Sequence, residues 1–377
     1  MGGDAISALT RGESPAFLST ATLQASMRVA FVSMETTHHD DSEGVQRIER
    51  IARLLAERGH EVTIFCAQSW EHGRETVTDS ELIYHGVTGG PAPTSFALRL
   101  PWALWRFDPD IVHAAPTPAS QVAAASIGGS LARAPLVLEY FGDAVPSGRW
   151  AGRALAKPAR IVAPSEMVRT ELRERGVPAE RLQLVPESID MDFVREVEAA
   201  DNVDVAFAHP LDETANLKSF LLGLAELRDR DWSARIIGDG PAREDYENEV
   251  EELRIDDRVE FVGECSREER LSIYKGAHAF VQTAYEEYFA SELLWALSCG
   301  CVGIVEYQAE SSAHELIENY DRSFRVTTPQ QIADAIEEAG NFEHLTVDEE
   351  WADFDHRPVL EQYLQLYRDL QDAYGLL

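Results

Sequence analysis

Two positions next to apolar runs have the chemistry to bind a ligand. Gly44 lies at the turn where the chain passes from the predicted strand at 28–34 into the predicted helix at 43–58, and backbone N–H groups at such a turn can approach a phosphate. An ordinary turn glycine explains Gly44 equally well. Glu139 follows the apolar run at 136–138, and its carboxylate is suited either to accept hydrogen bonds from ligand hydroxyls or to pair inside the core.

The sequence contains no pattern that indicates a metal site or a reactive thiol pair. The cysteines form no C-x-x-C pair, and no histidine and cysteine cluster has the spacing of a zinc site. The His-His-Asp-Asp run at 38–41 cannot direct four adjacent side chains to one ion and is better explained as a polar loop. We therefore expect no metal, no cofactor and four reduced thiols, Cys66, Cys265, Cys299 and Cys301.

The charge balance excludes several classes of partner. The 377 residues include 66 acidic and 33 basic ones, a formal charge of −33. No basic stripe is available for nucleic acid, and polybasic docking on an anionic bilayer is disfavoured. An acid-rich surface is typical of proteins that work in molar salt, where a Debye length of about 3 Å screens self-repulsion. We predict a halophilic protein, since the only lysines are Lys157, Lys218 and Lys275.

The chain has no sequence pattern of membrane insertion or export. No apolar run reaches the ~18 residues of a transmembrane helix, and residues 1–26 lack the pattern of a signal peptide. We expect residues 1–26 to be a disordered extension and the first strand to open at Met27. These features predict a cytoplasmic protein without a transmembrane segment.

Short apolar runs alternate with amphipathic stretches from Met27 onward. This alternation predicts an α/β protein with doubly wound, parallel, Rossmann-like sheets. The pattern restarts near 189–202, so we predict an N-terminal domain at 27–190, a C-terminal domain at 191–355 and a C-terminal helix at 356–377, for which a return to the first domain is one option. Ligands of such sheets bind beyond the carboxyl ends of the strands and, here, between the domains.

Six short motifs follow one another along the chain. They are SEGVQRIERIARLLAERGHEV at 42–62, DPDIVHA at 108–114, VAPSEMVRTELRERGVPAERLQLVPESID at 162–190, IIGDGPARED at 236–245, VEFVGE at 259–264 and ALSCG at 296–300. In this order and spacing they resemble the motifs of the family 4-type glycosyltransferases, which have the GT-B fold of two Rossmann-like domains facing a cleft.

The resemblance implies transfer of a sugar from a nucleotide-sugar donor, usually with retention of configuration and without a metal. The family's donor motif contains two glutamates eight positions apart, and anchoring on ALSCG places the first on Glu287, the implied catalytic residue. A diphosphate leaving group needs helix N-termini, loop amides and cations. Gly44, Gly238 and Gly240 are assigned to this donor side.

Several donor positions depart from the family pattern. Trp295 stands where the second glutamate is expected and cannot accept hydrogen bonds from ribose hydroxyls. Ala290 replaces a glycine, and Ser291 and Glu292 occupy the positions whose amides would face the diphosphate. A carboxylate there repels phosphate unless it turns away, although the helix dipole favours an acid in a first turn.

The family's phosphate-binding cations are also displaced. Their places correspond to His209 and Ala215. His209 is suited to donate a hydrogen bond or to pack in the core. Lys218 lies three residues beyond Ala215 and replaces the missing lysine if its helix turns it inward; otherwise it is a solvated surface lysine.

The acceptor side shows the same drift. His113 keeps one family histidine, whereas Phe141 stands where the family has a histidine near the reacting centre. We assign His113, Glu139 and Phe141 to the acceptor side.

Three functions follow from these residues. The favoured one is a glycosyltransferase that moves a sugar to a glycan, a lipid or another acceptor, with Glu287 holding sugar hydroxyls and the leaving phosphate taking the acceptor proton. The lost motif residues leave a non-catalytic GT-B binding or scaffold protein as an alternative, and a GT-B sugar epimerase as a third. Peripheral contact with a membrane is left open.

Overall fold

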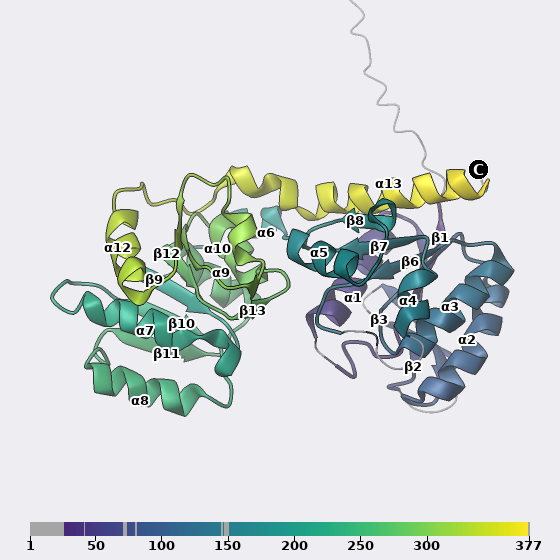
Figure 1. Cartoon of the computed structure of the whole chain (residues 1–377), viewed down its shortest axis with the longest axis horizontal. Helices are drawn as coiled ribbons and strands as arrows, with labels where there is room; N and C mark the ends of the chain where they lie inside the picture. The colour runs from purple at the N-terminus through teal and green to yellow at the C-terminus, as the bar shows by residue number, and fades with distance from the viewer. Residues whose placement is uncertain are drawn as a thin grey trace, which may run out of the picture.

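The computed structural model describes residues 26–40, 42–70, 74–79, 81–144, 146 and 151–375. The predicted extension at 1–26 lies outside these residues except for Ser26. The chain forms two α/β units side by side, and its last helical stretch begins beside the C-terminal unit and extends over the N-terminal one (Figure 1). Both main sheets carry helices on their faces, which confirms the predicted α/β class.

The N-terminal sheet forms because its central strands are apolar on both faces and are buried on both by helices. Its strand order is β3-β4-β2-β1-β5-β6-β7-β8, and only the β3–β4 pair is antiparallel. The strands are β1 (Arg28–Val32), β2 (Glu61–Ala67), β3 (Thr76–Asp79), β4 (Leu82–Thr88), β5 (Ile111–Ala114), β6 (Leu136–Glu139), β7 (Arg160–Ala163) and β8 (Leu182–Leu184).

The helices of this domain have amphipathic sequences and definite ends. Gly59, with φ +89°, follows the first of them, and the Ser165 side chain caps the last by accepting from the Val168 N–H. The helix at 93–107 was not predicted, because Pro101 interrupts its pattern. The helices are α1 (Glu43–Glu57), α2 (Pro93–Phe107), α3 (Ala119–Ala132), α4 (Ala151–Ala156) and α5 (Glu166–Glu174).

The C-terminal domain repeats the design with six parallel strands in the order β11-β10-β9-β12-β14-β16. The strands are β9 (Val203–Ala208), β10 (Ala234–Ile237), β11 (Val259–Gly263), β12 (Ala277–Gln282), β14 (Val302–Glu306) and β16 (Ser323–Val326). A separate pair consists of β13 (Glu286–Glu287) and β15 (Glu310–Ser311).

The helices of the C-terminal domain include the predicted buried helix at 291–298, which has these bounds in the structure. Three others, at 191–196, 267–276 and 329–339, were not predicted, although Ser266 and Glu269 form a capping box that marks the start of the helix at 267–276. The helices are α6 (Met191–Glu196), α7 (Leu217–Glu226), α8 (Arg243–Leu253), α9 (Arg267–Gly276), α10 (Ser291–Ser298), α11 (Ala313–Leu316) and α12 (Pro329–Ala339).

The last helix, α13 (His356–Tyr374), returns to the N-terminal domain. Its buried side chains, among them Tyr363 and Tyr367, share one core with Val29 and Phe31 of β1. The two chain crossings between the domains lie beside each other, joined by the bridge between Ile189 and Asp355. The core of the N-terminal domain is therefore completed by the end of the chain.

Candidate functional site

A cleft of about 830 Å³ lies between the two domains. Its walls come from the start of α1, the crossing at 187–189, the ends of β9 and β10, and the starts of α9 and α10. The β9 and β10 ends are carboxyl ends of parallel strands, where open α/β sheets bind their ligands. The cleft is therefore the candidate site.

Glu287 lies in this cleft with two polar neighbours. Gln282 Nε2 donates a hydrogen bond of 2.7 Å to Glu287 Oε1, and His209 Nε2 lies 3.5 Å from the same oxygen. His209 Nδ1 lies 2.8 Å from the Pro210 carbonyl oxygen, which makes Nδ1 a donor. Burial lowers the pKa of His209, but the hydrogen bond and charge of Glu287 outweigh it, so the pKa is raised. The pair offers a carboxylate and a hydrogen-bond donor to a ligand.

The head of α10 forms one wall of the cleft. Ala290 is its buried N-cap residue, and Ser291 and Trp295 line the cleft. The Arg267 guanidinium lies over the Trp295 ring, and its central carbon is 5.4 Å from the ring centroid. A stacked aromatic and a cation thus occupy the place that the second family glutamate would have.

The Gly-Asp-Gly turn after β10 is a structural requirement of the same wall. Gly238 has φ +124°, and a Cβ there would lie 2.1 Å from the His209 carbonyl oxygen. A Cβ at Gly240 would lie 2.4 Å from the Leu211 carbonyl oxygen. Only glycine permits this approach, which holds the His209 loop against the turn.

The Gly44 amide already has an anionic partner. It donates a hydrogen bond of 3.1 Å to Asp143 Oδ2, and a Cβ at Gly44 would lie 2.9 Å from both Asp143 oxygens. The favourable position for an anion at the start of α1 is therefore occupied by Asp143. Glu43 lines the cleft beside it with a solvent-exposed side chain. Although this side chain still reaches solvent, the protein that surrounds its carboxyl group in the cleft, and then the charges of Glu287, Glu292 and Asp143, raise the pKa of Glu43 to about 8.

The cations of the cleft are arginines that sequence reasoning missed. Arg50 pairs with Glu187, and Arg270 pairs with Glu292. Burial, then the charges of Arg47 and Arg267, lower the pKa of Arg50 to about 10, so it stays charged at neutral pH. Among the described residues, no hydrogen bond or ion pair engages Arg267. Nine carboxylates line the cleft against these three arginines.

Lys218 does not lie in the cleft, and its assignment to the donor side is corrected. Its side chain is 60% exposed, and Nζ lies 2.9 Å from Glu249 Oε2 of α8. The register of α7 turns its apolar residues inward, with Leu217, Phe220 and Leu221 buried, so Lys218 faces solvent.

His113 and Glu139 also lie outside the cleft, and their acceptor-side assignment is corrected. Both are fully buried. Glu139 accepts from Arg47 Nε at 2.7 Å and lies 3.0 Å from His113 Nε2, while His113 Nδ1 lies 2.6 Å from the Tyr367 hydroxyl. These contacts join α1, β5, β6 and α13. Of the two roles considered for Glu139, the structure therefore shows the carboxylate paired inside the core.

Phe141 is the acceptor-side residue that does line the cleft. Its ring meets the Tyr288 ring edge-on, with centroids 6.5 Å apart. Tyr288 lies on the C-terminal domain, and its carbonyl accepts a hydrogen bond of 2.7 Å from Ser165 Oγ of the N-terminal domain. Phe141 therefore stands where the two cleft walls touch.

One carboxylate links the domains below the cleft. Glu315 accepts hydrogen bonds from the Glu166 and Met167 N–H groups at 2.8 and 2.7 Å. A side chain of the C-terminal domain thus caps the start of α5 in the N-terminal domain. The contact joins the two domains in this conformation.

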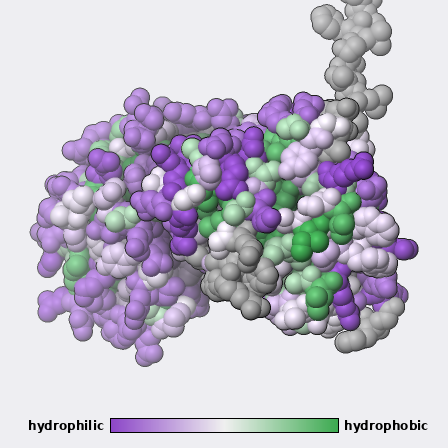
Figure 2. All heavy atoms as spheres, turned by 45° about the vertical axis from the view of Figure 1, so that its right-hand side comes forward, coloured by the Kyte–Doolittle hydropathy of each residue, from purple (hydrophilic) through white to green (hydrophobic). Residues whose placement is uncertain are grey.

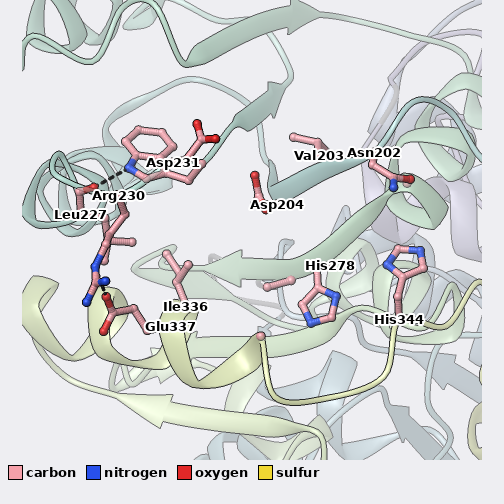
Figure 3. Close-up of a pocket in the computed structure, with 14 residues that line it drawn as sticks. Asn202, Val203, Asp204, Leu227, Arg230, Asp231, His278, Ile336, Glu337 and His344 are labelled. Carbon is pink, nitrogen blue, oxygen red and sulfur yellow. Dashed lines mark hydrogen bonds and ion pairs between the residues drawn. The ribbon is translucent and has the colours of Figure 1, made fainter.

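A second cavity, of about 460 Å³, lies at the other end of the C-terminal sheet, beside the start of β9 and β12 (Figure 3). The rings of His278 and His344 stack there, and each donates to a backbone carbonyl. Arg230 pairs with Glu337. These polar groups already have protein partners and do not converge on one point, so this cavity is not the candidate site. Within the described residues, no group of three or more His, Cys, Asp or Glu side chains is arranged to hold a metal ion.

Two family profiles match the chain, one over each domain. Glycosyltransferase Family 4 matches residues 44–193, and Glycosyl transferases group 1 matches residues 189–346. Two facing Rossmann-like domains with a cleft between them are the architecture of the GT-B fold. The chain belongs to these enzymes, with a family 4 N-terminal half and a group 1 C-terminal half. The prediction of sugar transfer from a nucleotide-sugar donor is confirmed at this level.

Solved structures share the fold at low sequence identity. A glycosyltransferase from Rickettsia africae aligns with a TM-score of 0.74 and 13% identity over 92% of this chain and 99% of its own. The Anabaena protein HepE in complex with UDP gives 0.70 and 16% over 91% and 100%. Sucrose-phosphate synthase from Thermosynechococcus elongatus gives 0.69 and 17% over 92% and 100%. No curated protein matches the chain in sequence.

Proposed function

We propose that the chain transfers a sugar from a uridine diphosphate donor to a glycan or lipid-linked acceptor, with retention of anomeric configuration. The observation that carries the proposal is the convergence of Glu287, Ser291 and Arg267 on one interdomain cleft. The structurally similar Anabaena protein has been solved with UDP and with UDP-glucose, which supports the choice of donor.

The roles of the residues follow from their chemistry. The Glu287 carboxylate accepts hydrogen bonds from sugar hydroxyls and is oriented by Gln282 and His209. Arg267 and the start of α10 stabilise the negative charge that grows on the diphosphate. The ring of Trp295, already stacked under Arg267, forms an apolar floor for the nucleotide. In this assignment Arg267 replaces the displaced family cations.

The chemical step needs no further co-reactant. The bond between the anomeric carbon and the diphosphate oxygen breaks, and the acceptor oxygen forms its bond on the same face of the sugar. The acceptor hydroxyl gives its proton to the departing phosphate oxygen. The protein positions both groups and stabilises charge, which are the main sources of catalysis for such a transfer.

The test is thermal unfolding in about 3 M KCl with a panel of nucleotides and nucleotide-sugars. A ligand at a hundred times its dissociation constant stabilises by about 2.7 kcal/mol, so we expect a clear shift with uridine diphosphate sugars. Product analysis with the selected donor then reports the anomeric configuration. An inverted product would contradict retention, and the absence of any shift in folded protein would contradict the donor assignment.

The matched variants are Glu287→Gln and Glu310→Gln. Glu310 pairs with the neighbouring strand and does not line the cleft. Loss of a charge-assisted hydrogen bond of about 1.5–3 kcal/mol predicts a fall in kcat/KM of roughly 10- to 150-fold for Glu287→Gln. Glu310→Gln is expected to keep wild-type turnover.

A further inference from the structure

The exposed face of α2 and α3 is apolar. Leu98, Trp102 and Trp105 on α2 and Ile127 and Leu131 on α3 are each between 54% and 78% exposed. Figure 2 shows hydrophobic residues gathered on the N-terminal domain, whereas the surface of the C-terminal domain in the same view is mostly hydrophilic. Singly exposed apolar residues are ordinary, but a group of them marks an interaction surface.

The five side chains form one surface because the two helices are in close contact. A Cβ at Gly128 of α3 would lie 2.8 Å from a methyl group of Leu104 and 3.1 Å from the Pro101 Cα, both on α2. The opposite face of α2, with Phe96, Leu100 and Leu104, is buried in the core. The outward residues at 98, 102 and 105 follow helical spacing, so this stripe is additional to what the core requires.

The charge on this face is opposite to that of the whole chain. Neither helix contains an acidic residue, whereas 66 acids in 377 residues would place about five on 29 helical residues. Arg99, Arg106 and Arg133 are exposed there. Within the described part of the chain, none of these three arginines forms an ion pair. The Arg106 guanidinium instead lies 5.7 Å from the centroid of the Trp102 ring.

A groove beside α2 continues the same surface. Its volume is about 1040 Å³, and it lies between α2 and the strands β2 and β4. Arg99 and Arg106 line it together with the carboxylate of Glu75 and with Arg28, whose guanidinium is paired with Glu61. The basic and apolar character therefore extends from the helix face to the sheet edge.

We propose that the face of α2 and α3 docks the enzyme on an anionic lipid bilayer. Tryptophan, with an apolar ring and a polar N–H, is suited to the boundary between headgroups and acyl chains, and arginine keeps its charge at the headgroups while its stem lies on apolar surface. A helix with Trp and Leu on one face and basic residues beside them binds in the plane of such an interface. Among the described residues, no helix is long and apolar enough to span a membrane.

This proposal revises the conclusion from net charge. A total of −33 disfavours an anionic surface only if the charge is spread evenly. Screening limits the reach of each charge to about 10 Å at 0.1 M salt and to about 3 Å at 1 M. The local face of three arginines and no helix carboxylate is attractive to anionic headgroups. The distribution of charge, and not its sum, decides which surface meets the lipid.

The experiment is co-sedimentation of the full chain with vesicles of phosphatidylglycerol or of phosphatidylcholine. It is done at the lowest KCl concentration at which circular dichroism shows folded protein. We expect binding to phosphatidylglycerol vesicles with a blue shift of tryptophan fluorescence, and binding at least 10-fold weaker to phosphatidylcholine. Trp102→Ser with Trp105→Ser, and separately Arg99→Glu with Arg106→Glu, are each expected to weaken binding at least 10-fold.

The matched controls are Tyr374→Ser and Arg173→Glu, which remove an exposed aromatic and an exposed arginine elsewhere on the molecule. They are expected to bind vesicles like the wild type. Unchanged thermal midpoints and nucleotide-induced shifts show that each variant is folded. Absence of vesicle binding by folded wild type overturns the proposal. So does a dimer that dissociates in the tryptophan variants while no vesicle binds, since the face would then join two copies.

Discussion

At the residue scale, the cleft obtains its cations from positions that no local pattern marks. Arg267 begins α9 and lies over Trp295 of α10, and these residues meet only because the two helices pack together. Lys218, the cation nearest in sequence to the lost family lysine, is held by Glu249 on the surface. Arg267 of α9 therefore supplies the positive charge near α10 that Lys218 of α7 does not.

Arg267→Gln is therefore expected to weaken donor binding, whereas Lys218→Gln leaves it unchanged. A charge-assisted contact to phosphate contributes about 1.5–3 kcal/mol, which corresponds to a rise in Kd of roughly 10- to 150-fold. Isothermal calorimetry with the selected nucleotide-sugar measures both variants. A larger effect in Lys218→Gln than in Arg267→Gln would contradict the assignment.

Glu43 predicts a pH dependence of donor binding. Its pKa is raised to about 8 by withdrawal from water and by Glu287, Glu292 and Asp143. Below this pH the carboxyl is mostly neutral; above it, the added negative charge repels a diphosphate. We expect the Kd of a nucleotide-sugar, whose diphosphate stays ionised throughout, to rise several-fold between pH 7 and 9.

The control for this titration is a pair of variants. Glu43→Gln is expected to flatten the dependence, because it keeps the neutral form at every pH. Glu174→Gln changes an exposed carboxylate of α5 and is expected to retain the wild-type curve. An unaltered curve in Glu43→Gln would assign the titration to another group.

At the element scale, α13 is held to the N-terminal sheet by a buried polar network. Arg47 of α1 donates to Glu139, to Glu187 at 2.6 Å and to the Tyr363 hydroxyl at 2.6 Å. Burial raises the pKa of Glu139, but Arg47 and His113 outweigh it and lower that pKa overall. The charged pair therefore persists at neutral pH, and its stabilising contribution is lost only as the pH falls through this lowered pKa.

Glu139→Ala is expected to lower the free energy of unfolding by about 3–5 kcal/mol, because it leaves Arg47 buried without its main partner. Urea unfolding measures the loss, and Glu57→Gln, at an exposed position of α1, is the control with little effect. Donor affinity of the folded fraction is expected to stay at the wild-type value, since Glu139 lies outside the cleft. A rise in the KM for the acceptor without loss of stability would restore the acceptor-side role of Glu139.

At the scale of the whole molecule, charge repulsion acts on two domains that close on an acidic cleft. The chain carries −33, and nine carboxylates face one another across the cleft. Contacts between the domains, such as the hydrogen bonds from the start of α5 to the Glu315 carboxylate, hold the walls together against this repulsion. The prediction of a halophilic protein follows from the same excess of negative charge, which salt screens.

We expect the thermal midpoint to rise between 0.2 and 3 M KCl by at least about 5 °C, which corresponds to a gain of roughly 1–3 kcal/mol for domains of this size. The same thermal scan in sucrose of matched osmolality distinguishes charge screening by KCl from a stabilisation that any excluded solute would give. A midpoint that stays flat or falls with KCl would contradict the halophilic prediction.

The sequence alone determined the features that depend on neighbours along the chain. Alternating apolar runs predicted the parallel sheets, and the helix at 291–298 has the predicted bounds, because periodicity and caps are local properties. The helix at 93–107 escaped prediction because Pro101 breaks its pattern, while Leu100 and Leu104 are held inward by the fold. Glu287 was placed by a motif and lies in the cleft.

Only the tertiary structure decided which distant residues meet. His113 and Glu139 lie near the carboxyl ends of the adjacent strands β5 and β6 and resemble cleft residues in sequence. However, α13 arrives from the far end of the chain and covers them with Tyr363 and Tyr367. Likewise Arg267 reaches the cleft through packing of α9 against α10. Side-chain partners on different helices and strands are selected by burial and charge in three dimensions, so no periodicity in the sequence reveals them.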